Sequence, residues 1–200
     1  MKSVVNLLAA AMLLFAAGAA GAQELQYKID RVMGKADAPI TIVEYASTTC
    51  PHCAVFHHET LPKLKAEWID TGRAKLIYRD FPTGPKALSV GASMIAHCAG
   101  PERYFPLLGL IMDKQSQWAG NSNPLGELKK LAKLAGMGED KVDACLKDQD
   151  LANAIEARAM EGYKKLGVES TPSILINGKL VPGGGVSYDT LNKALQAVAK

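Results

Sequence analysis

Residues 40–53 read ITIVEYASTTCPHC, and the prediction of the fold begins there. The first half, Ile40–Ala46, is β-branched and almost continuously apolar, which is typical of a strand covered on both faces. Residues 47–49 interrupt this pattern. Pro51 then favours the first turn of a helix, because its missing N–H would be unpaired there anyway. The stretch predicts a buried strand, a short loop and a helix with Cys50-Pro51-His52-Cys53 at its N-terminus.

Cys50 and Cys53 are three residues apart across this first helical turn, so they can close a small disulfide ring. The positive pole and free N–H groups of the helix N-terminus stabilise a thiolate at Cys50, and His52 adds a donor beside it. We expect Cys50 to be the exposed attacking sulfur and Cys53 the shielded resolving one. A stabilised thiolate favours the reduced protein, which makes the disulfide a stronger oxidant.

Two other interpretations of this motif remain open. The first is a passive structural disulfide, although such a short bridge at a helix start is strained and labile. The second is a metal site, because Cys50, His52, Cys53, His57 and His58 are close in sequence. Zinc sites usually take a second ligand pair from farther along the chain, and the sequence has no such pair. We therefore predict a redox site without metal or cofactor, with His57 and His58 as surface or packing residues.

The first 22 residues are predicted to be a secretory signal peptide rather than part of the fold. Lys2 is followed by the apolar stretch Val4–Ala17, and Ala20-Gly21-Ala22 offers a cleavage site. The apolar stretch is shorter than the ~20 residues needed to span a bilayer. An uncleaved membrane anchor is the alternative. Export places the mature chain in an oxidising compartment, where disulfides persist.

Composition restricts the class of protein further. The 200 residues are 48% hydrophobic and 22% charged, which is a globular balance and excludes a disordered, collagenous or multi-pass membrane protein. The net charge is +3, from 23 Lys and Arg against 20 Asp and Glu. No block of like charge stands out, so we expect no nucleic acid among the partners.

The remaining chain alternates between strand and helix signals. Leu61, Leu64 and Trp68 form the buried stripe of the first helix, which Pro62 should kink or divide. Residues 74–80 form a second strand. Asn177-Gly178 predicts a hairpin between strands at 173–176 and 179–181, and Ser187 should cap a last helix.

Between these parts, residues 82–166 show helical stripes separated by Gly and Pro, with a loop expected after Gln115. We predict a signal peptide over 1–22 and a fold formed by residues 23–81 and 167–200. An all-helical insertion is expected over residues 82–166.

Cys98 and Cys145 are the other two cysteines, and both adjoin apolar helical stripes in the predicted insertion. Given the predicted export, we expect a structural disulfide between them rather than two free buried thiols. Closing so long a loop would contribute about 3–4 kcal/mol in the chain-entropy model.

Two further positions carry candidate functions with alternatives. Glu44 lies in an otherwise apolar strand, six residues before Cys50, where a carboxylate is costly to bury without a role or a partner. It could relay protons to and from Cys53, or form an ion pair with Lys75 or Arg79 on the next strand. Thr171-Pro172 precedes a strand, and from the residues alone its peptide bond could be cis or trans.

These pieces together resemble the DsbA family of exported thiol:disulfide oxidoreductases. The resemblance covers essentially the whole mature chain and rests on these segments: Ile42-Val43-Glu44-Tyr45, Cys50-Pro51-His52-Cys53, Tyr78-Arg79-Asp80-Phe81-Pro82, the helical insertion and Thr171-Pro172. It implies a thioredoxin-like α/β fold, with a central mixed sheet flanked by helices and an inserted all-helical subdomain. It also implies a cis Pro172 facing the active disulfide, with the backbone of Thr171 aligning the substrate chain.

The resemblance further implies what the site does. Cys50, Cys53, His52, Pro172 and Glu44 would be catalytic, and Thr171, Pro172 and Pro51 would contact substrate. The reaction would be disulfide formation in reduced or unfolded exported proteins in the periplasm. A membrane partner of the DsbB type would reoxidise the pair.

Thr171 departs from the valine of the best-known oxidases and is similar to the residue of disulfide isomerases. Isomerases of this type are usually oligomers with a separate association domain, and residues 23–39 look too short for one, so we expect a monomeric oxidase. The alternatives are an isomerase or reductase of the same fold, or a metal-binding module that uses the Cys50/His52/Cys53 cluster.

Overall fold

The computed structural model describes residues 29–185 and 187–199, so the predicted signal peptide lies outside the described residues. Within these ranges, five strands form one mixed sheet in the order β1-β3-β2-β4-β5. β2 and β3 are parallel and the other neighbours are antiparallel. The strands are β1 (Arg31–Met33), β2 (Ile40–Ala46), β3 (Ala74–Asp80), β4 (Ser173–Ile176) and β5 (Lys179–Leu180).

The helices fall into three groups along the chain. The first is a run of α and π turns: α1 (Pro51–Val55), η1 (Phe56–Thr60), α2 (Leu61–Leu64) and η2 (Lys65–Ile69). The second comprises α3 (Lys86–Cys98), α4 (Pro101–Asp113), α5 (Gln115–Trp118), α6 (Pro124–Leu134), α7 (Glu139–Cys145) and α8 (Gln149–Leu166). The third comprises the 3-10 turn η3 (Pro182–Gly185) and α9 (Tyr188–Val198).

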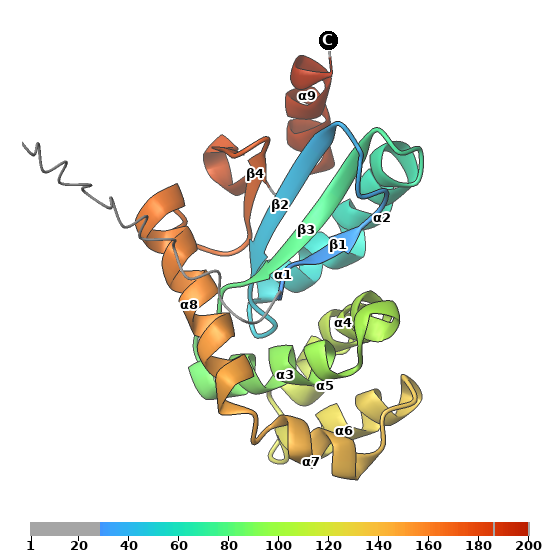
Figure 1. The fold of residues 1–200 in the computed structure, drawn as a ribbon, viewed down its shortest axis with the longest axis vertical. Helices are drawn as coiled ribbons and strands as arrows, with labels where there is room; N and C mark the ends of the chain where they lie inside the picture. Colours follow the sequence, from blue (N-terminus) through green and yellow to red (C-terminus); the bar gives the residue numbers. More distant parts are fainter. Residues whose placement is uncertain (1–28, 186, 200) are drawn as a thin grey trace, which may run out of the picture.

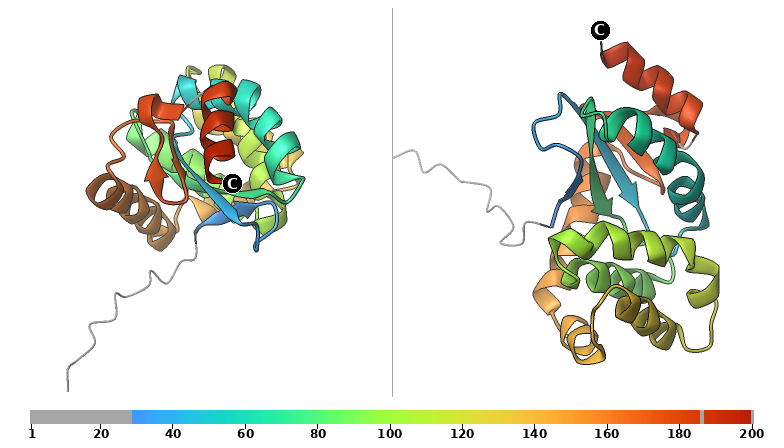
Figure 2. Two further views of the ribbon diagram at one scale, coloured as in Figure 1. Left: turned by 90° about the horizontal axis from the view of Figure 1, so that it is seen from above. Right: turned by 90° about the vertical axis from the view of Figure 1, so that its right-hand side faces the viewer.

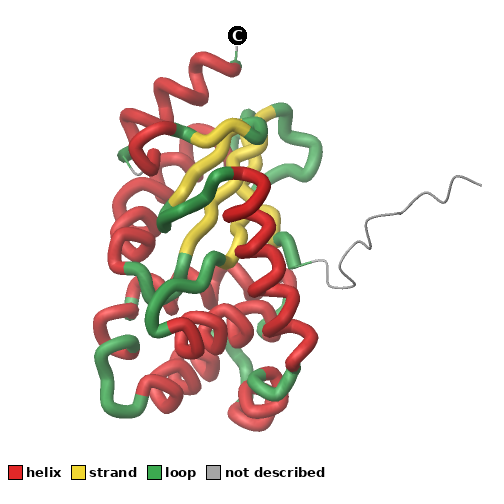
Figure 3. Tube along the Cα trace, turned by 90° about the vertical axis from the view of Figure 1, so that its left-hand side faces the viewer, coloured by secondary structure: helices red, strands yellow, loops and turns green. Residues whose placement is uncertain are grey.

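β2 is the centre of the sheet and is buried on both faces, as its apolar sequence predicts. Its alternate residues point to opposite faces. On one face, Ile42 joins a core with Phe56, Leu64 and Trp68 from the run α1–η2. On the other face, Tyr45 packs in a cluster that includes residues at the end of α8. The sheet is therefore the middle layer between two helical layers (Figure 3).

A glycine permits the close approach of α8 to the sheet. A Cβ atom at Gly162 would lie 2.5 Å from Cε1 of the buried Tyr45 ring. A larger residue at 162 would therefore force the helix and strand apart.

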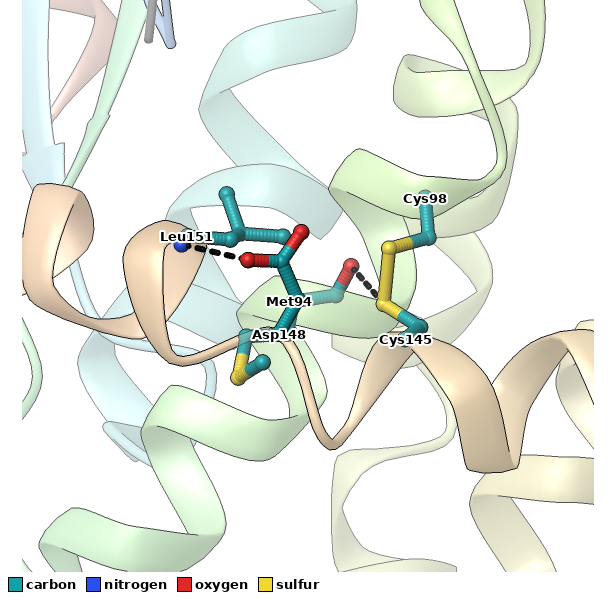
Figure 4. Close-up of a disulfide and its surroundings, with 5 residues drawn as sticks. All are labelled: Met94, Cys98, Cys145, Asp148 and Leu151. Atoms are coloured by element: carbon teal, nitrogen blue, oxygen red, sulfur yellow. Dashed lines mark hydrogen bonds between the residues drawn. A yellow bond between two sulfur atoms is a disulfide. The ribbon is translucent and has the colours of Figure 1, made fainter. Parts of the chain in front are cut away.

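Helices α3–α7 gather beyond the end of the sheet at which β2 and β3 finish, and α8 returns from them along the sheet (Figures 1 and 2). Their core contains the fully buried Leu107, Ile111 and Trp118. The helical insertion of the expected thioredoxin-like fold is thus present. A disulfide of 2.03 Å joins Cys98 at the end of α3 to Cys145 at the end of α7 (Figure 4).

Several local predictions agree with the structure. The hairpin between β4 and β5 turns at Asn177 and Gly178, which have φ angles of +47° and +79°. The side chain of Ser187 accepts a hydrogen bond from Thr190 N at the start of α9. Pro62 lies at the start of α2, between the two π turns that divide the first helix.

Two elements differ from the prediction. β1 was not expected, because three residues of mixed polarity carry no periodic pattern, and the strand exists only through its pairing with β3. The residues after Gln115 are expected to form a loop, but Gln115–Trp118 is a helical turn, anchored by the fully buried indole of Trp118. Across 29–185 and 187–199, no helix combines the length and apolarity that crossing a membrane requires.

Candidate active site

Cys50 is the N-cap residue of α1, at the junction between the β2 loop and the helix. Its carbonyl accepts hydrogen bonds from the N–H groups of Cys53 and Ala54, at 3.1 and 3.2 Å. Both cysteines are free thiols; Cys50 is partly exposed, and Cys53 is buried. The exposed sulfur therefore precedes the buried one by a single helical turn, as expected for an attacking and a resolving thiol.

The environment of Cys50 lowers its pKa from 9.0 to about 5. The main cause is a hydrogen bond from the Cys53 thiol, and burial acts in the opposite direction. Hydrogen bonds from the Thr171 side chain and from the N–H groups of Cys53 and His52 lower the pKa further. Backbone N–H groups at a helix N-terminus are natural partners for an anion. At neutral pH the Cys50 sulfur of the reduced protein is therefore a thiolate.

Cys53 has the opposite shift, because burial strongly raises its pKa. The hydrogen bond to the Cys50 sulfur and the negative charges of Cys50 and Glu44 raise this pKa further. One opposing contact is the Ser47 N–H, which donates to the Cys53 sulfur at 3.4 Å. Cys53 therefore keeps its proton while Cys50 gives its proton up.

The segment before β4 lies directly against Cys50. The Thr171–Pro172 peptide bond is cis, and the Thr171 carbonyl oxygen is 3.3 Å from the Cys50 sulfur. Pro172 itself is buried, while Pro51 and His52, which follow Cys50 in the chain, are exposed. The structure thus brings Thr171 and Pro172 to the motif, 121 positions away in sequence.

Glu44 is completely buried, and its partner is His57 rather than either basic residue considered from the sequence. His57 Nε2 lies 3.0 Å from Glu44 Oε1, and the His57 side chain is only 7% exposed. Lys75 bonds instead to the carbonyl of Ala36, and Arg79 to Asp30 and the hydroxyl of Tyr45. The alternative of a Lys75 or Arg79 ion pair with Glu44 is therefore wrong.

His57 and His58 have different environments although they are adjacent. The His58 side chain is 74% exposed and lies 3.7 Å from Asp113, which agrees with a surface residue. His57 faces the sheet. The signal for this was its position four residues after Cys53, because residues four apart share one face of a helix.

Gln115 is a residue of the site that the sequence reasoning missed. Its side-chain Nε2 donates to the carbonyl oxygens of Thr48, at 2.8 Å, and of Cys50, at 3.0 Å. The loop is also held by hydroxyl contacts, in which Ser47 Oγ lies 2.8 Å from Ser89 Oγ of α3. The helical subdomain therefore fixes the backbone that presents Cys50. No local pattern distinguished Gln115 from the other polar residues near it.

The five Cys and His side chains considered as metal ligands do not form one cluster. Among the side chains of residues 29–185 and 187–199, no group of three or more His, Cys, Asp and Glu is arranged to hold a metal ion. His57 is instead bonded to Glu44.

Comparisons with known proteins agree with this geometry. A family model described as thioredoxin matches residues 27–197. A putative protein-disulfide oxidoreductase of Rickettsia conorii is 30% identical over 167 residues, which cover 83% of this chain and 59% of that protein. The chain thus spans less than two thirds of that relative.

Two solved structures resemble the chain over most of their length. Wolbachia pipientis alpha-DsbA1 has a TM-score of 0.77 and 28% identity, covering 88% of this chain and 94% of that one. A structure described as a protein-disulfide isomerase from Novosphingobium aromaticivorans has a TM-score of 0.74 and 25% identity, covering 86% and 97%.

Proposed function

Because the chain belongs to the thioredoxin family and is similar to DsbA proteins, we propose that it forms disulfides in exported proteins by thiol–disulfide exchange through Cys50 and Cys53. The observation that carries this proposal is the pair of opposite pKa shifts on two adjacent thiols. Cys50 has a pKa of about 5, while burial raises that of Cys53. Stabilising one thiolate stabilises the reduced state, so the oxidised pair readily accepts electrons.

The proposed reaction has two exchange steps. A substrate thiolate attacks the Cys50 sulfur of the oxidised pair, the Cys50–Cys53 bond breaks, and Cys53 leaves as a thiolate that takes up a proton. A second substrate thiolate then attacks the substrate sulfur of the mixed disulfide. Cys50 leaves as a thiolate, and its low pKa makes it a good leaving group. The substrate loses two electrons, and the Cys50–Cys53 pair gains them.

The surrounding residues have proposed roles in these steps. The Thr171 backbone and Pro172, which lie against Cys50, would align the substrate chain, and the exposed Pro51 would contact it. His52 would support the thiolate through its backbone N–H. Glu44, whose charge acts on Cys53, would exchange a proton with that buried thiol.

The cellular context is part of the same proposal. The leader-like residues 1–22 support export to the periplasm, where the substrates would be reduced or unfolded proteins. A membrane partner of the DsbB type would reoxidise the pair. We expect the protein to act as a monomer, without metal or cofactor.

The test is the oxidative refolding of a reduced protein with several cysteines. The wild type should accelerate disulfide formation, and Cys50→Ala should abolish catalysis, because no attackable sulfur remains at the exposed position. Cys53→Ala, mixed instead with a substrate that already holds a disulfide, should accumulate a mixed disulfide on Cys50, visible by mass spectrometry under non-reducing conditions. The Cys50 thiolate breaks the substrate disulfide and releases one substrate thiolate, and no second enzyme thiol is left to displace the bound chain. A Cys50→Ala variant that still accelerates oxidation would show that the mechanism is wrong.

An isomerase is the second candidate, favoured by Thr171 before the cis proline and by the similarity to the Novosphingobium protein. It is distinguished by the equilibrium of the Cys50–Cys53 pair with glutathione and by the oligomeric state in solution. A low reduction potential, together with a dimer or trimer, would favour the isomerase. A high potential in a monomer would favour the oxidase.

A further inference from the structure

His57 contacts both Glu44, whose charge acts on the Cys53 thiol, and a hollow at the surface. The hollow has a volume of about 120 Å³ and lies between the first helix and α4. This volume is well above the roughly 10–15 Å³ that a cavity needs to hold one water molecule. The residues that line it are Met33, His57, His58, Leu61, Phe105, Gly109 and Asp113. His57 thus touches this hollow and Glu44 at the same time.

We propose that His57 is a positioning residue that transfers protons between this hollow and Glu44, and so supplies the proton that Cys53 takes up or loses in each reaction. The inference rests on the proposed function, because Cys53 changes its protonation only when the Cys50–Cys53 disulfide is broken or formed. It assigns His57 a role beyond packing.

The arrangement of the three groups supports a relay. Cys53 and His57 are four residues apart on one helical run, so their side chains are neighbours on its sheet-facing side. Glu44 lies opposite, on β2, and binds His57 through Oε1 only. Its other oxygen, Oε2, is buried without a hydrogen-bond partner among the described residues. That oxygen is available to hold a proton on the buried side of the pair.

A buried thiol needs such a relay because it has no direct contact with solvent. Cys53 is 0% exposed, so water cannot reach the sulfur in this structure. When the disulfide is reduced, the Cys53 thiolate would take a proton from the Glu44 carboxylic acid. The carboxylate would then be reprotonated by the His57 imidazolium, and the neutral imidazole would take a proton from water in the hollow. Each step moves one proton, and the reverse sequence operates on reoxidation.

Other ionisable groups also face His57. The Tyr78 ring of β3 packs against the imidazole at 5.9 Å between ring centroids, and burial raises the pKa of its hydroxyl, so it stays neutral. Across the hollow, Asp113 of α4 pairs with both His58 and Lys114. The groups around His57 are therefore Glu44, Cys53, Tyr78, His58 and Asp113.

The experiment measures single-turnover oxidation of a dithiol peptide by the pre-oxidised full-length protein between pH 5 and 9. The variants are His57→Ala and His57→Gln; the glutamine keeps a hydrogen-bond donor but does not titrate. His58→Ala is the matched control, because it removes an adjacent imidazole on the same hollow that does not bind Glu44. Rates are expressed relative to this control at each pH, so that ionisation of the peptide thiol cancels.

Both His57 variants should be slower by about tenfold or more, a modest part of the range for acid–base groups. Free imidazole in solution should restore the rate of His57→Ala, whose missing side chain opens onto the hollow, but not that of His57→Gln. Titration of the Cys50 thiolate by ultraviolet absorbance should be unchanged in all variants, which separates proton transfer from loss of the nucleophile. A role limited to packing predicts neither the loss in the glutamine variant nor the rescue.

The outcomes separate the two proposals. If the wild type does not oxidise the peptide, the proposed function fails. If the wild type and His58→Ala are active and both His57 variants match them at every pH, only the relay is overturned. A slowed His57→Ala that imidazole does not restore also overturns it.

Discussion

Cys50 and Cys53 have the same side chain and lie one helical turn apart, yet their pKa values move in opposite directions. The cause is where each sulfur lies relative to the N-terminus of α1. The helix N-terminus gives Cys50 N–H donors and the Cys53 thiol as a third donor, whereas Cys53 is enclosed by apolar side chains. Burial disfavours the charged form of a thiol, and hydrogen bonds to the sulfur favour it. Cys50 is therefore an ionised nucleophile, while Cys53, one helical turn away, keeps its proton.

This difference predicts how the stability of the reduced protein depends on pH. The pKa of Cys50 is about 5 in the folded protein and close to 9.0 when unfolded, so the folded protein binds fewer protons between these values. The stabilisation is present above the unfolded pKa and is lost as the pH falls towards 5. Cys53 reduces this stabilisation only at alkaline pH, because there the thiol ionises in the unfolded chain but keeps its proton in the folded protein.

The measurement is the thermal unfolding midpoint of the reduced protein minus that of the oxidised protein, whose paired sulfurs do not titrate. This difference should decrease steadily from pH 8 to pH 5. Other groups titrate in both redox forms, so their effects largely cancel. A difference that stays constant over this interval would show that Cys50 is not ionised in the folded protein.

At the scale of secondary-structure elements, the site depends on a contact between the loop that precedes α1 and a helical turn far away in sequence. The loop between β2 and α1 carries Cys50, and Gln115 at the start of α5 binds two of its carbonyl groups. Gln115 is 7% exposed, so these carbonyls would not gain full hydration if the side chain were removed. Through Gln115, the short helix α5 thus holds the backbone of the active-site loop in place.

Replacing Gln115 with alanine should destabilise the protein by about 1–3 kcal/mol, because buried acceptors lose their donor. Chemical denaturation of the oxidised protein measures this free energy of unfolding. Gln117→Ala is the matched control, because Gln117 is exposed on the same turn and should cost less than about 0.5 kcal/mol. Equal effects of the two substitutions would show that the contacts of Gln115 do not hold the loop.

How far the sequence predicts these elements depends on how local their cause is. The strand at 40–46 and the hairpin at Asn177-Gly178 follow from local residue chemistry, and both agree with the structure. β1 exists through pairing with β3, and no pattern within its three residues records that pairing. Cys50 and Cys53 are visible through their spacing. The partners Gln115 and His57 could be assigned only once the helices were placed against the sheet.

At the scale of the whole molecule, the helical subdomain is inserted between β3 and β4, so its packing is coupled to the sheet at both ends. Cys98 and Cys145 join α3 to α7 across a sequence separation of 47 residues. Asp148 follows closely and caps α8, accepting a hydrogen bond from Leu151 N at 2.9 Å (Figure 4). The disulfide therefore stands next to the point where the chain leaves the small helices and returns to the sheet.

Removing this disulfide should lower the free energy of unfolding by about 3–4 kcal/mol, because the unfolded chain regains the entropy of an open loop of this length. The Cys98→Ala/Cys145→Ala variant tests this by chemical denaturation, which should show a lower midpoint with a single cooperative transition. Reductant also acts on the redox-active pair Cys50 and Cys53, so a comparison that uses reductant needs the background variant Cys50→Ala/Cys53→Ala. In that background, dithiothreitol should destabilise the protein by the same amount as the Cys98→Ala/Cys145→Ala substitution. Dithiothreitol could lower the free energy of unfolding while the Cys98→Ala/Cys145→Ala substitution does not. That result would show that the loss comes from strain around the two free thiols rather than from the opened loop.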